Sequence, residues 1–266
     1  MDDLKRYEEL VKTIEYHNDR YYNQDDPEIS DYEYDMMMKE LKKLEKDHPE
    51  YVTPSSPTQH VGGSAKREAG VLVRHRVPML SLQDVFSKEE VQEFVESMQE
   101  TLVDPVFVVE YKIDGLSMAL RYENGLLTTA ITRGDGIIQG EDVTVNAKVI
   151  KDVKNKLKEP IEYLEVRGEV YMTNEAFDKV NEIQELNNKK TFANPRNCAA
   201  GTLRQLDSRI TKQRNLSMFI FNIQDIRGKE ITSHSQGYEY LKIQGMKVID
   251  NYQVCHNFEE VLSLIH

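Results

Sequence analysis

The sequence predicts an α+β protein, with a small helical part followed by a larger part built on mainly antiparallel sheets. Apolar residues recur at helical spacing over residues 1–50, whereas runs rich in β-branched and aromatic residues begin at residue 106. Strands and helices then follow in irregular order, with hairpin signals, which is typical of the α+β class. Residues 53–70 are rich in Pro, Ser and Gly, so we expect a linker between the two parts.

Two helices are expected in the N-terminal part. One face of the first helix is formed by Leu4, Tyr7, Val11, Ile14 and Tyr21. The second starts at Ser30, and Glu33 three residues later completes a capping box. Its apolar face is formed by Tyr34, Met37, Met38, Leu41 and Leu44. The second helix ends before Pro49, and the two helices are expected to pack as a hairpin.

The larger part contains runs typical of strands at residues 106–111, 116–122, 126–132, 163–172 and 216–223. Glu123-Asn124-Gly125 predicts a hairpin between two of them. Helices are expected at residues 87–101 and 174–187. Gly134-Asp135-Gly136 predicts a turn, and the Gly-x-Gly-x-x-Gly spacing of a Rossmann fold is absent.

The composition favours a soluble cytoplasmic protein. No apolar run approaches the roughly 20 residues of a membrane span, and the acidic N-terminus is unlike a secretory signal. Cys198 and Cys255 are far apart, which argues against a disulfide framework. We interpret Cys198 as a packing residue. His60, His75 and His256 lack metal-ligand spacing.

The charge is distributed unevenly. The net charge of −12 argues against a nucleic-acid-binding protein, and residues 1–50 carry 8 basic against 16 acidic side chains. Residues 187–214, however, carry 7 basic residues against Asp207 alone. Such a segment could meet phosphates, although charge alone leaves a solvated loop equally open.

Lys112 is the strongest candidate for a catalytic residue. Alternation at the end of a strand would place Glu110, Lys112 and Asp114 on one face, just before Gly115. A lysine amine attacks phosphorus only when neutral, and its ordinary pKa of about 10.4 is lowered by desolvation or a nearby cation. The two acids would therefore bind a metal or nucleotide, or take a proton, and Gly115 would permit close backbone approach. A salt-bridged strand end is the alternative.

Two further segments supply groups that such a site needs. Arg133 follows a strand and could hold a phosphate or stack on a base. Glu169 lies within a predicted strand, where its carboxylate could accept hydrogen bonds from ribose hydroxyls. Arg167 lies two residues earlier on the same face, so a cross-strand ion pair is the alternative for Arg167 and Glu169.

Together these segments resemble the nucleotidyltransferase superfamily of DNA ligases, RNA ligases and capping enzymes. Lys112-Ile113-Asp114-Gly115 is similar to its first motif, and Glu169 lies where its third-motif acid would be. A narrower resemblance, to bacterial NAD-dependent DNA ligases, is carried by residues 29–35, 56–63, 78–82, 132–136, 165–172 and 192–207.

The resemblance implies a helical nicotinamide mononucleotide-binding domain with its linker (residues 1–65) and an adenylation, or nucleotidyltransferase (ATP-grasp-like), domain (residues 66–266). Lys112 would attack the adenylyl phosphorus of NAD, form lysyl-AMP and release nicotinamide mononucleotide. AMP would then pass to a DNA 5′-phosphate, and a 3′-hydroxyl would displace it to seal the nick in replication and repair. NAD as substrate, Mg²⁺, nicked double-stranded DNA as partner and a monomeric state are expected.

The resemblance also assigns roles to individual residues. Glu110 is expected to bind adenine, Arg133 the nucleotide and Glu169 the ribose. The remaining residues expected to line the nucleotide site are Ser81, Leu82 and Asp114, and those expected to face DNA phosphates are Arg196 and Arg204.

In the N-terminal part, nicotinamide mononucleotide is expected to contact Tyr21, Tyr22, Asp31, Tyr34 and Asp35. Asp31, Tyr34 and Asp35 share one helix face, and a cationic ring suits tyrosine faces and carboxylates. The residues alone favour another interpretation, in which Tyr34 belongs to the core and the aspartates favour the helix N-terminus.

The family pattern continues with Asp-Gly-x-Val-x-Lys, a further lysine motif and additional domains. We therefore expect the adenylation domain to be incomplete, truncated at its C-terminal end, and the chain not to complete ligation alone. Residues 134–143 are one residue longer than is usual in the family, which a loop tolerates. Two alternatives stay open: an ATP- or GTP-using enzyme of the RNA-ligase or capping type, disfavoured by the Tyr21, Tyr22, Asp31 and Asp35 cluster, and an inactive NAD- or DNA-binding module.

Overall fold

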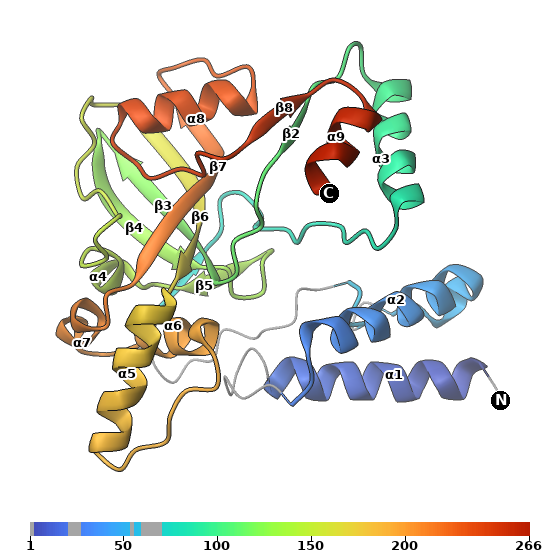
Figure 1. Ribbon diagram of the computed structural model, residues 1–266, viewed down its shortest axis with the longest axis horizontal. Coiled ribbons are helices and arrows are strands. Elements are labelled where there is room, and N and C mark those ends of the chain that lie inside the picture. The colour runs from blue at the N-terminus through green and yellow to red at the C-terminus, as the bar shows by residue number, and fades with distance from the viewer. Residues whose placement is uncertain (1–2, 21–27, 54–55, 60–70) are drawn as a thin grey trace.

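The computed structural model describes residues 3–20, 28–53, 56–59 and 71–266, and of Asp31 only the backbone (Figure 1). A helical hairpin is followed by a four-stranded sheet with its helices, and by a smaller group of helices and strands beside it. This arrangement confirms the predicted α+β class.

The hairpin consists of α1 (Asp3–Asn18) and α2 (Asp31–Asp47), followed by a short 3₁₀ helix (Pro49–Tyr51). The predicted capping box is confirmed: the Ser30 hydroxyl accepts from the Glu33 N–H, and the Glu33 carboxylate accepts from the Ser30 N–H. The buried contacts between the helices come from Tyr7, Leu10, Ile14 and Leu41. The hairpin is therefore held by the apolar faces that the spacing predicts.

The beginning of the predicted linker is docked on this hairpin. Thr58 Oγ1 donates to Glu45 Oε2 at 2.6 Å, and the buried Ser56 hydroxyl donates to the same carboxylate. Tyr7 adds a bond to Glu45 Oε1 at 3.4 Å. Residues 54–55 and 60–70, and with them the boundary predicted after residue 65, lie outside the described residues.

The main sheet has the strand order β4-β3-β6-β7, with every neighbouring pair antiparallel. Its strands are β3 (Leu116–Glu123), β4 (Leu126–Thr132), β6 (Tyr163–Tyr171) and β7 (Ser217–Arg227). The predicted hairpin joins β3 to β4, and its turn residues Asn124 and Gly125 have φ of 50° and 77°. Positive φ at both positions matches the right-handed twist of the strands.

The two faces of this sheet differ in chemistry. Even-numbered residues of β3 and β6, such as Leu120 and Val166, face the apolar core. That core is covered by α4 (Thr144–Ala147), α5 (Asn174–Leu186), α6 (Pro195–Leu203) and α8 (His234–Ile243), and α7 (Ser208–Gln213) packs on α4 and α6. Since side chains alternate along a strand, Ser117, Arg167 and Glu169 share the opposite face. That polar face carries the candidate site.

A smaller group of elements lies beside the main sheet (Figure 1). Strand β2 (Phe107–Val109) pairs with β8 (Gln253–Cys255), and α3 (Lys88–Thr101) and α9 (Phe258–Ile265) pack on them around Val95, Cys255 and Val261. A separate pair joins β1 (Leu72–Arg74) to β5 (Gln139–Glu141). The helices predicted at residues 87–101 and 174–187 are confirmed as α3 and α5.

Two expectations need correction. One is the alternative that residues 187–214 form a solvated loop: it holds only for residues 187–193, which are irregular and mostly exposed, whereas Asn194 caps α6, whose residues Cys198, Ala199 and Leu203 are buried in the core. The strand predicted at residues 106–111 ends at Val109, since its partner β8 offers only three residues for pairing. Within the described residues, no helix is long and apolar enough to cross a membrane.

Candidate active site

Lys112 lies in irregular backbone between β2 and β3, and its side chain is exposed. The backbone of Gly115 approaches β6 so closely that a Cβ there would lie 2.2 Å from the Val170 carbonyl oxygen. The predicted close approach at Gly115 is therefore confirmed. Because no strand runs through residues 110–115, the shared face expected for Glu110, Lys112 and Asp114 is wrong.

The two acids instead contact different helices. Asp114, whose side chain is 74% exposed, accepts from Arg196 Nη1 of α6 at 3.3 Å. Glu110 turns towards α8, where Tyr238 donates its hydroxyl hydrogen to Glu110 Oε2 at 2.5 Å. The segment that carries Lys112 is thus tied on one side to α6 and on the other to α8.

Glu169 is a half-buried carboxylate on the polar face of the sheet. Ser117 Oγ donates to Glu169 Oε2 at 2.7 Å, and Arg167 Nη2 donates to Ser117 Oγ at 3.4 Å. Arg167 Nη1 also donates to the Leu80 carbonyl oxygen at 2.8 Å. In place of the cross-strand ion pair considered from the sequence, Ser117 lies between Arg167 and Glu169.

Cations from the loop before β3, the turn after β4 and α6 act electrostatically on Glu169. Burial raises the pKa of Glu169, and after the Ser117 bond the groups that counteract this rise are Arg196, Lys112 and Arg133. Burial also lowers the pKa of Arg167, which Arg133 lowers further by repulsion. Positive charges around a hydrogen-bonding carboxylate suit a phosphate ester that also bears hydroxyl groups.

Arg133 is held by its backbone as well as by its side chain. Its N–H donates to the Ser117 carbonyl at 3.2 Å, and its own carbonyl accepts from His75 Nε2 at 2.8 Å. Its guanidinium Nη1 lies 3.4 Å from Ser81 Oγ, whereas the neighbouring Leu82 is 71% exposed. The loop bearing Ser81 therefore meets the turn after β4, as expected for two segments of one site.

Arg204 contacts the end of β5. Its Nε donates to Glu141 Oε2 at 3.1 Å, and the Glu141 side chain is only 12% exposed. Of the two arginines expected to face DNA, Arg196 contacts the Lys112 segment and Arg204 contacts the end of β5. Both guanidinium groups remain partly exposed.

Sequence reasoning missed several groups that position the site. Ser117 carries a detectable signal, because it follows Gly115 by two residues and alternation puts it on the face of Glu169. Tyr238 and His234 carry none, since they lie more than 100 residues from Glu110 and contact it only in the fold. His234 Nε2 lies 3.5 Å from the same Glu110 oxygen.

Replacement of Tyr238 by phenylalanine tests the tie between Glu110 and α8. The phenol is buried, and burial together with Glu110 raises the pKa of Tyr238 well above its ordinary value. Loss of a hydrogen bond to a charged acceptor is expected to lower the free energy of unfolding by about 1.5–3 kcal/mol in urea denaturation. Tyr252→Phe is the matched control, because its hydroxyl contacts an exposed carboxylate at 3.3 Å; equal losses would contradict a special role for Tyr238.

The N-terminal candidate residues lie on or beside the hairpin. Tyr34 is half-buried against the hairpin core, and its hydroxyl donates to Asn18 Oδ1 at 2.7 Å. Asp35 is half-buried on α2, and Asp31 begins that helix. Tyr21 and Tyr22, and the Asp31 side chain, lie outside the described residues.

Lys39 joins the hairpin to the larger part. The Lys39 ammonium on α2 lies 3.1 Å from Glu90 Oε1 on α3 and 4.7 Å from the ring centre of Phe86.

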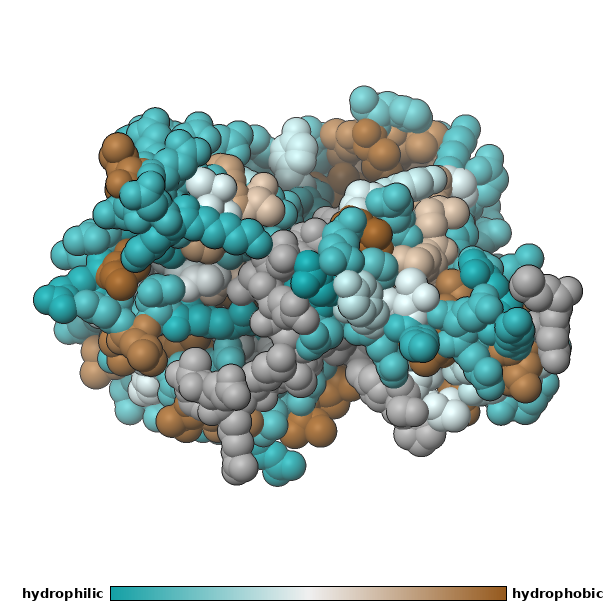
Figure 2. Space-filling view, turned by 90° about the horizontal axis from the view of Figure 1, so that it is seen from below, coloured by the Kyte–Doolittle hydropathy of each residue, from teal (hydrophilic) through white to brown (hydrophobic). Residues whose placement is uncertain are grey.

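On the face seen in Figure 2, hydrophilic side chains predominate and hydrophobic ones form small separate groups wherever described residues are visible. A surface of this kind is typical of a water-exposed face.

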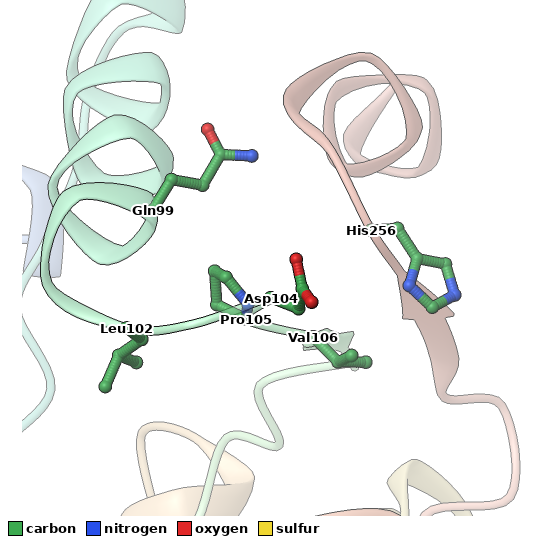
Figure 3. A pocket seen from close by; sticks show the side chains of 6 residues that line it. All are labelled: Gln99, Leu102, Asp104, Pro105, Val106 and His256. Atoms are coloured by element: carbon green, nitrogen blue, oxygen red, sulfur yellow. The ribbon is translucent and has the colours of Figure 1, made fainter.

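Two other kinds of candidate site were considered among the described residues: a cluster of metal-ligating side chains and a surface hollow. In the described part of the chain, no three His, Cys, Asp or Glu side chains gather as a metal would require. The hollow in Figure 3 lies between the end of α3 and the turn after β8, and Lys112 is not among its lining residues. It is lined by Gln99, Leu102, Asp104, Pro105, Val106 and His256.

Known families match both parts of the chain. Residues 70–266 match the family described as NAD-dependent DNA ligase adenylation domain, and residues 1–62 match the one described as DNA ligase-like, N-terminal NAD+-binding domain. The mixed fold with its antiparallel sheets is accordingly that of a nucleotidyltransferase-like adenylation domain preceded by helices. The chain belongs to the NAD-dependent DNA ligase family.

Curated relatives named DNA ligase agree with this assignment. The chain is 56% identical over 265 residues to the protein from Clostridium kluyveri, covering 100% of this chain and 40% of that protein. It is 53% identical over 263 residues to the one from Caldicellulosiruptor saccharolyticus, covering 98% and 38%. The chain thus spans about 40% of the length of these relatives.

Proposed function

We propose that this chain is the adenylation region of an NAD-dependent DNA ligase, in which Lys112 takes AMP covalently from NAD. The observation that carries the proposal is the placement of Lys112, Arg133 and Arg196 close enough to act electrostatically on the half-buried carboxylate of Glu169. The family match over residues 70–266 supports the same conclusion.

The reaction follows from this arrangement. The lone pair of the Lys112 amine attacks the adenylyl phosphorus of NAD, and a nitrogen–phosphorus bond forms. The bond from that phosphorus to the bridging oxygen breaks, so nicotinamide mononucleotide leaves with the electron pair, and the amine loses a proton. Arg133 and Arg196 stabilise the charge that develops on phosphate oxygens, while Glu169 accepts a hydrogen bond from the ribose.

The remaining roles belong to the same proposal. Glu110, Asp114, Ser81 and Leu82 line the adenine and phosphate side of the site. The residues that hold nicotinamide mononucleotide are Tyr21, Tyr22, Asp31, Tyr34 and Asp35. Arg196 and Arg204 meet the phosphates of nicked double-stranded DNA, which accepts the AMP before its nick is sealed. We place the protein in the cytoplasm as a monomer, with domains at residues 1–65 and 66–266.

Magnesium is part of the expected chemistry, but the described residues do not build a site for it. Asp114 is engaged by Arg196, and the described residues hold no three-ligand cluster. Mg²⁺ is commonly bound through substrate phosphates with few protein ligands. We therefore include the ion in the assay and assign it no residue and no step.

Intact mass measurement tests the proposal. The purified chain is incubated with MgCl₂ and either NAD or ATP, and its mass is determined before and after. A mass gain of one AMP with NAD but not with ATP is expected. A gain with ATP alone would favour an RNA-ligase or capping-type enzyme, and no gain with either nucleotide would overturn the proposal for this chain.

A further inference from the structure

Ser117 donates a hydrogen bond to the half-buried Glu169 carboxylate. We propose that Ser117, held in place by Arg167, is a positioning residue that fixes Glu169 to receive a hydroxyl group of the nucleotide ribose. The identity of the ligand rests on the proposed function, whereas the positioning of Glu169 rests on the contacts of the polar sheet face. The two parts are therefore tested separately.

The register of the sheet places the two side chains together. Ser117 on β3 is directly opposite Glu169 on β6, so their side chains share a face and meet across the strands. Ser117 Oγ engages Glu169 Oε2 at 2.7 Å. Among the described residues Glu169 Oε1 has no hydrogen-bond partner, so that oxygen is left for a ligand hydroxyl.

Arg167 determines the direction of the serine hydroxyl. A guanidinium can only donate, and a hydroxyl has one hydrogen to give. Because Arg167 Nη2 donates to Ser117 Oγ at 3.4 Å, the serine hydrogen is directed to Glu169. Arg167 is itself fixed by the Leu80 carbonyl at 2.8 Å and lies 5.4 Å from the ring centre of Phe221.

The hydrogen bond from Ser117 affects the pKa of the Glu169 carboxyl. Burial raises the pKa of Glu169, and the Ser117 hydroxyl is the first of the groups that oppose the rise. The charged groups facing the carboxylate are Lys112 before β3, Arg133 after β4 and Arg196 on α6, with Arg167 on its own strand. Without the hydroxyl, Glu169 would hold its proton to higher pH and would then lose acceptor capacity.

Titration of Glu169 tests the positioning contact without any reaction. The side-chain carboxyl is followed by ¹³C NMR in the full chain, with Glu169→Gln used to assign the signal. Ser117→Ala is expected to raise the titration midpoint, and Ser117→Thr, which keeps a hydroxyl, is expected to restore it. Ser217→Ala is the matched control, since that buried serine of β7 has no hydrogen-bond partner among the described residues. An unchanged midpoint in Ser117→Ala would overturn the inference.

Binding of two nucleotides tests the ribose role. Calorimetric titration compares AMP with 2′,3′-dideoxy-AMP, which lacks both ribose hydroxyls. Ser117→Ala is expected to weaken AMP binding about tenfold, because a hydrogen bond to a charged acceptor is lost or misdirected, and to leave dideoxy-AMP binding unchanged. Equal weakening of both nucleotides would overturn the Ser117 inference alone, whereas a wild-type chain that binds neither would overturn the proposed function and the ribose role with it.

Discussion

Replacement of Lys112 by arginine is expected to abolish the AMP adduct while nucleotide binding is retained. Arginine keeps the positive charge, but its guanidinium is not deprotonated in proteins and offers no free amine lone pair. The exposed side chain of Lys112 makes no packing contribution that the change would remove. The adduct is measured by intact mass after incubation with NAD, and NAD binding by calorimetry.

Lys151→Arg provides the control, because Lys151 is also exposed and lies outside the site. This variant is expected to form the adduct at the wild-type rate. A Lys112→Arg chain that still gains one AMP would show that another residue is the nucleophile. Loss of NAD binding together with the adduct would instead identify Lys112 as a binding residue.

Replacement of Arg121 by methionine is expected to cause the largest loss of stability. Arg121 and Glu165 form an ion pair at 2.8 Å within the sheet, and their side chains are only 6% and 0% exposed. Tyr163 donates to the same Glu165 oxygen at 2.5 Å, and Arg121 Nη2 donates to the Arg74 carbonyl at 2.9 Å. Removal of the cation leaves a buried carboxylate without its counter-charge, so the free energy of unfolding should fall by about 3–5 kcal/mol.

Urea denaturation measures this effect and its controls. The double variant Arg121→Met/Glu165→Leu is expected to recover part of the loss, because it removes both charges from the interior. Lys179→Met breaks the exposed pair with Glu175 on α5, at 67% and 82% exposure, and is expected to cause no measurable change. Equal effects of Arg121→Met and Lys179→Met would contradict the role assigned to the buried pair.

Elements with a long local pattern could be predicted from the sequence. The hairpin helices follow from the spacing of residues such as Tyr7 and Ile14, and the β3–β4 hairpin follows from Asn124-Gly125. Strands of three residues, such as β1, β5 and β8, contain too few residues to show a period. The length of β2 depends on the β8 strand about 145 residues away, which no local pattern reveals.

The residues of the candidate site can be predicted from the sequence only in part, for the same reason. Residue chemistry and resemblance to a family identify Lys112, Arg133 and Glu169. In the structure, Lys112 and Arg133 are close enough to act electrostatically on Glu169. The shared strand face assumed for Glu110 and Asp114 was wrong because the strand ends before them. Tyr238 could not be predicted, since its contact with Glu110 is made only when α8 packs on the sheet.

The position of the AMP group tests the central claim most directly. The chain is incubated with NAD and MgCl₂, digested, and its peptides are sequenced by tandem mass spectrometry at a pH that preserves phosphoramidates. We predict that a single peptide carries AMP and that the modified residue is Lys112. AMP on any other lysine, or spread over several exposed lysines, would contradict the assignment of Lys112 as the nucleophile.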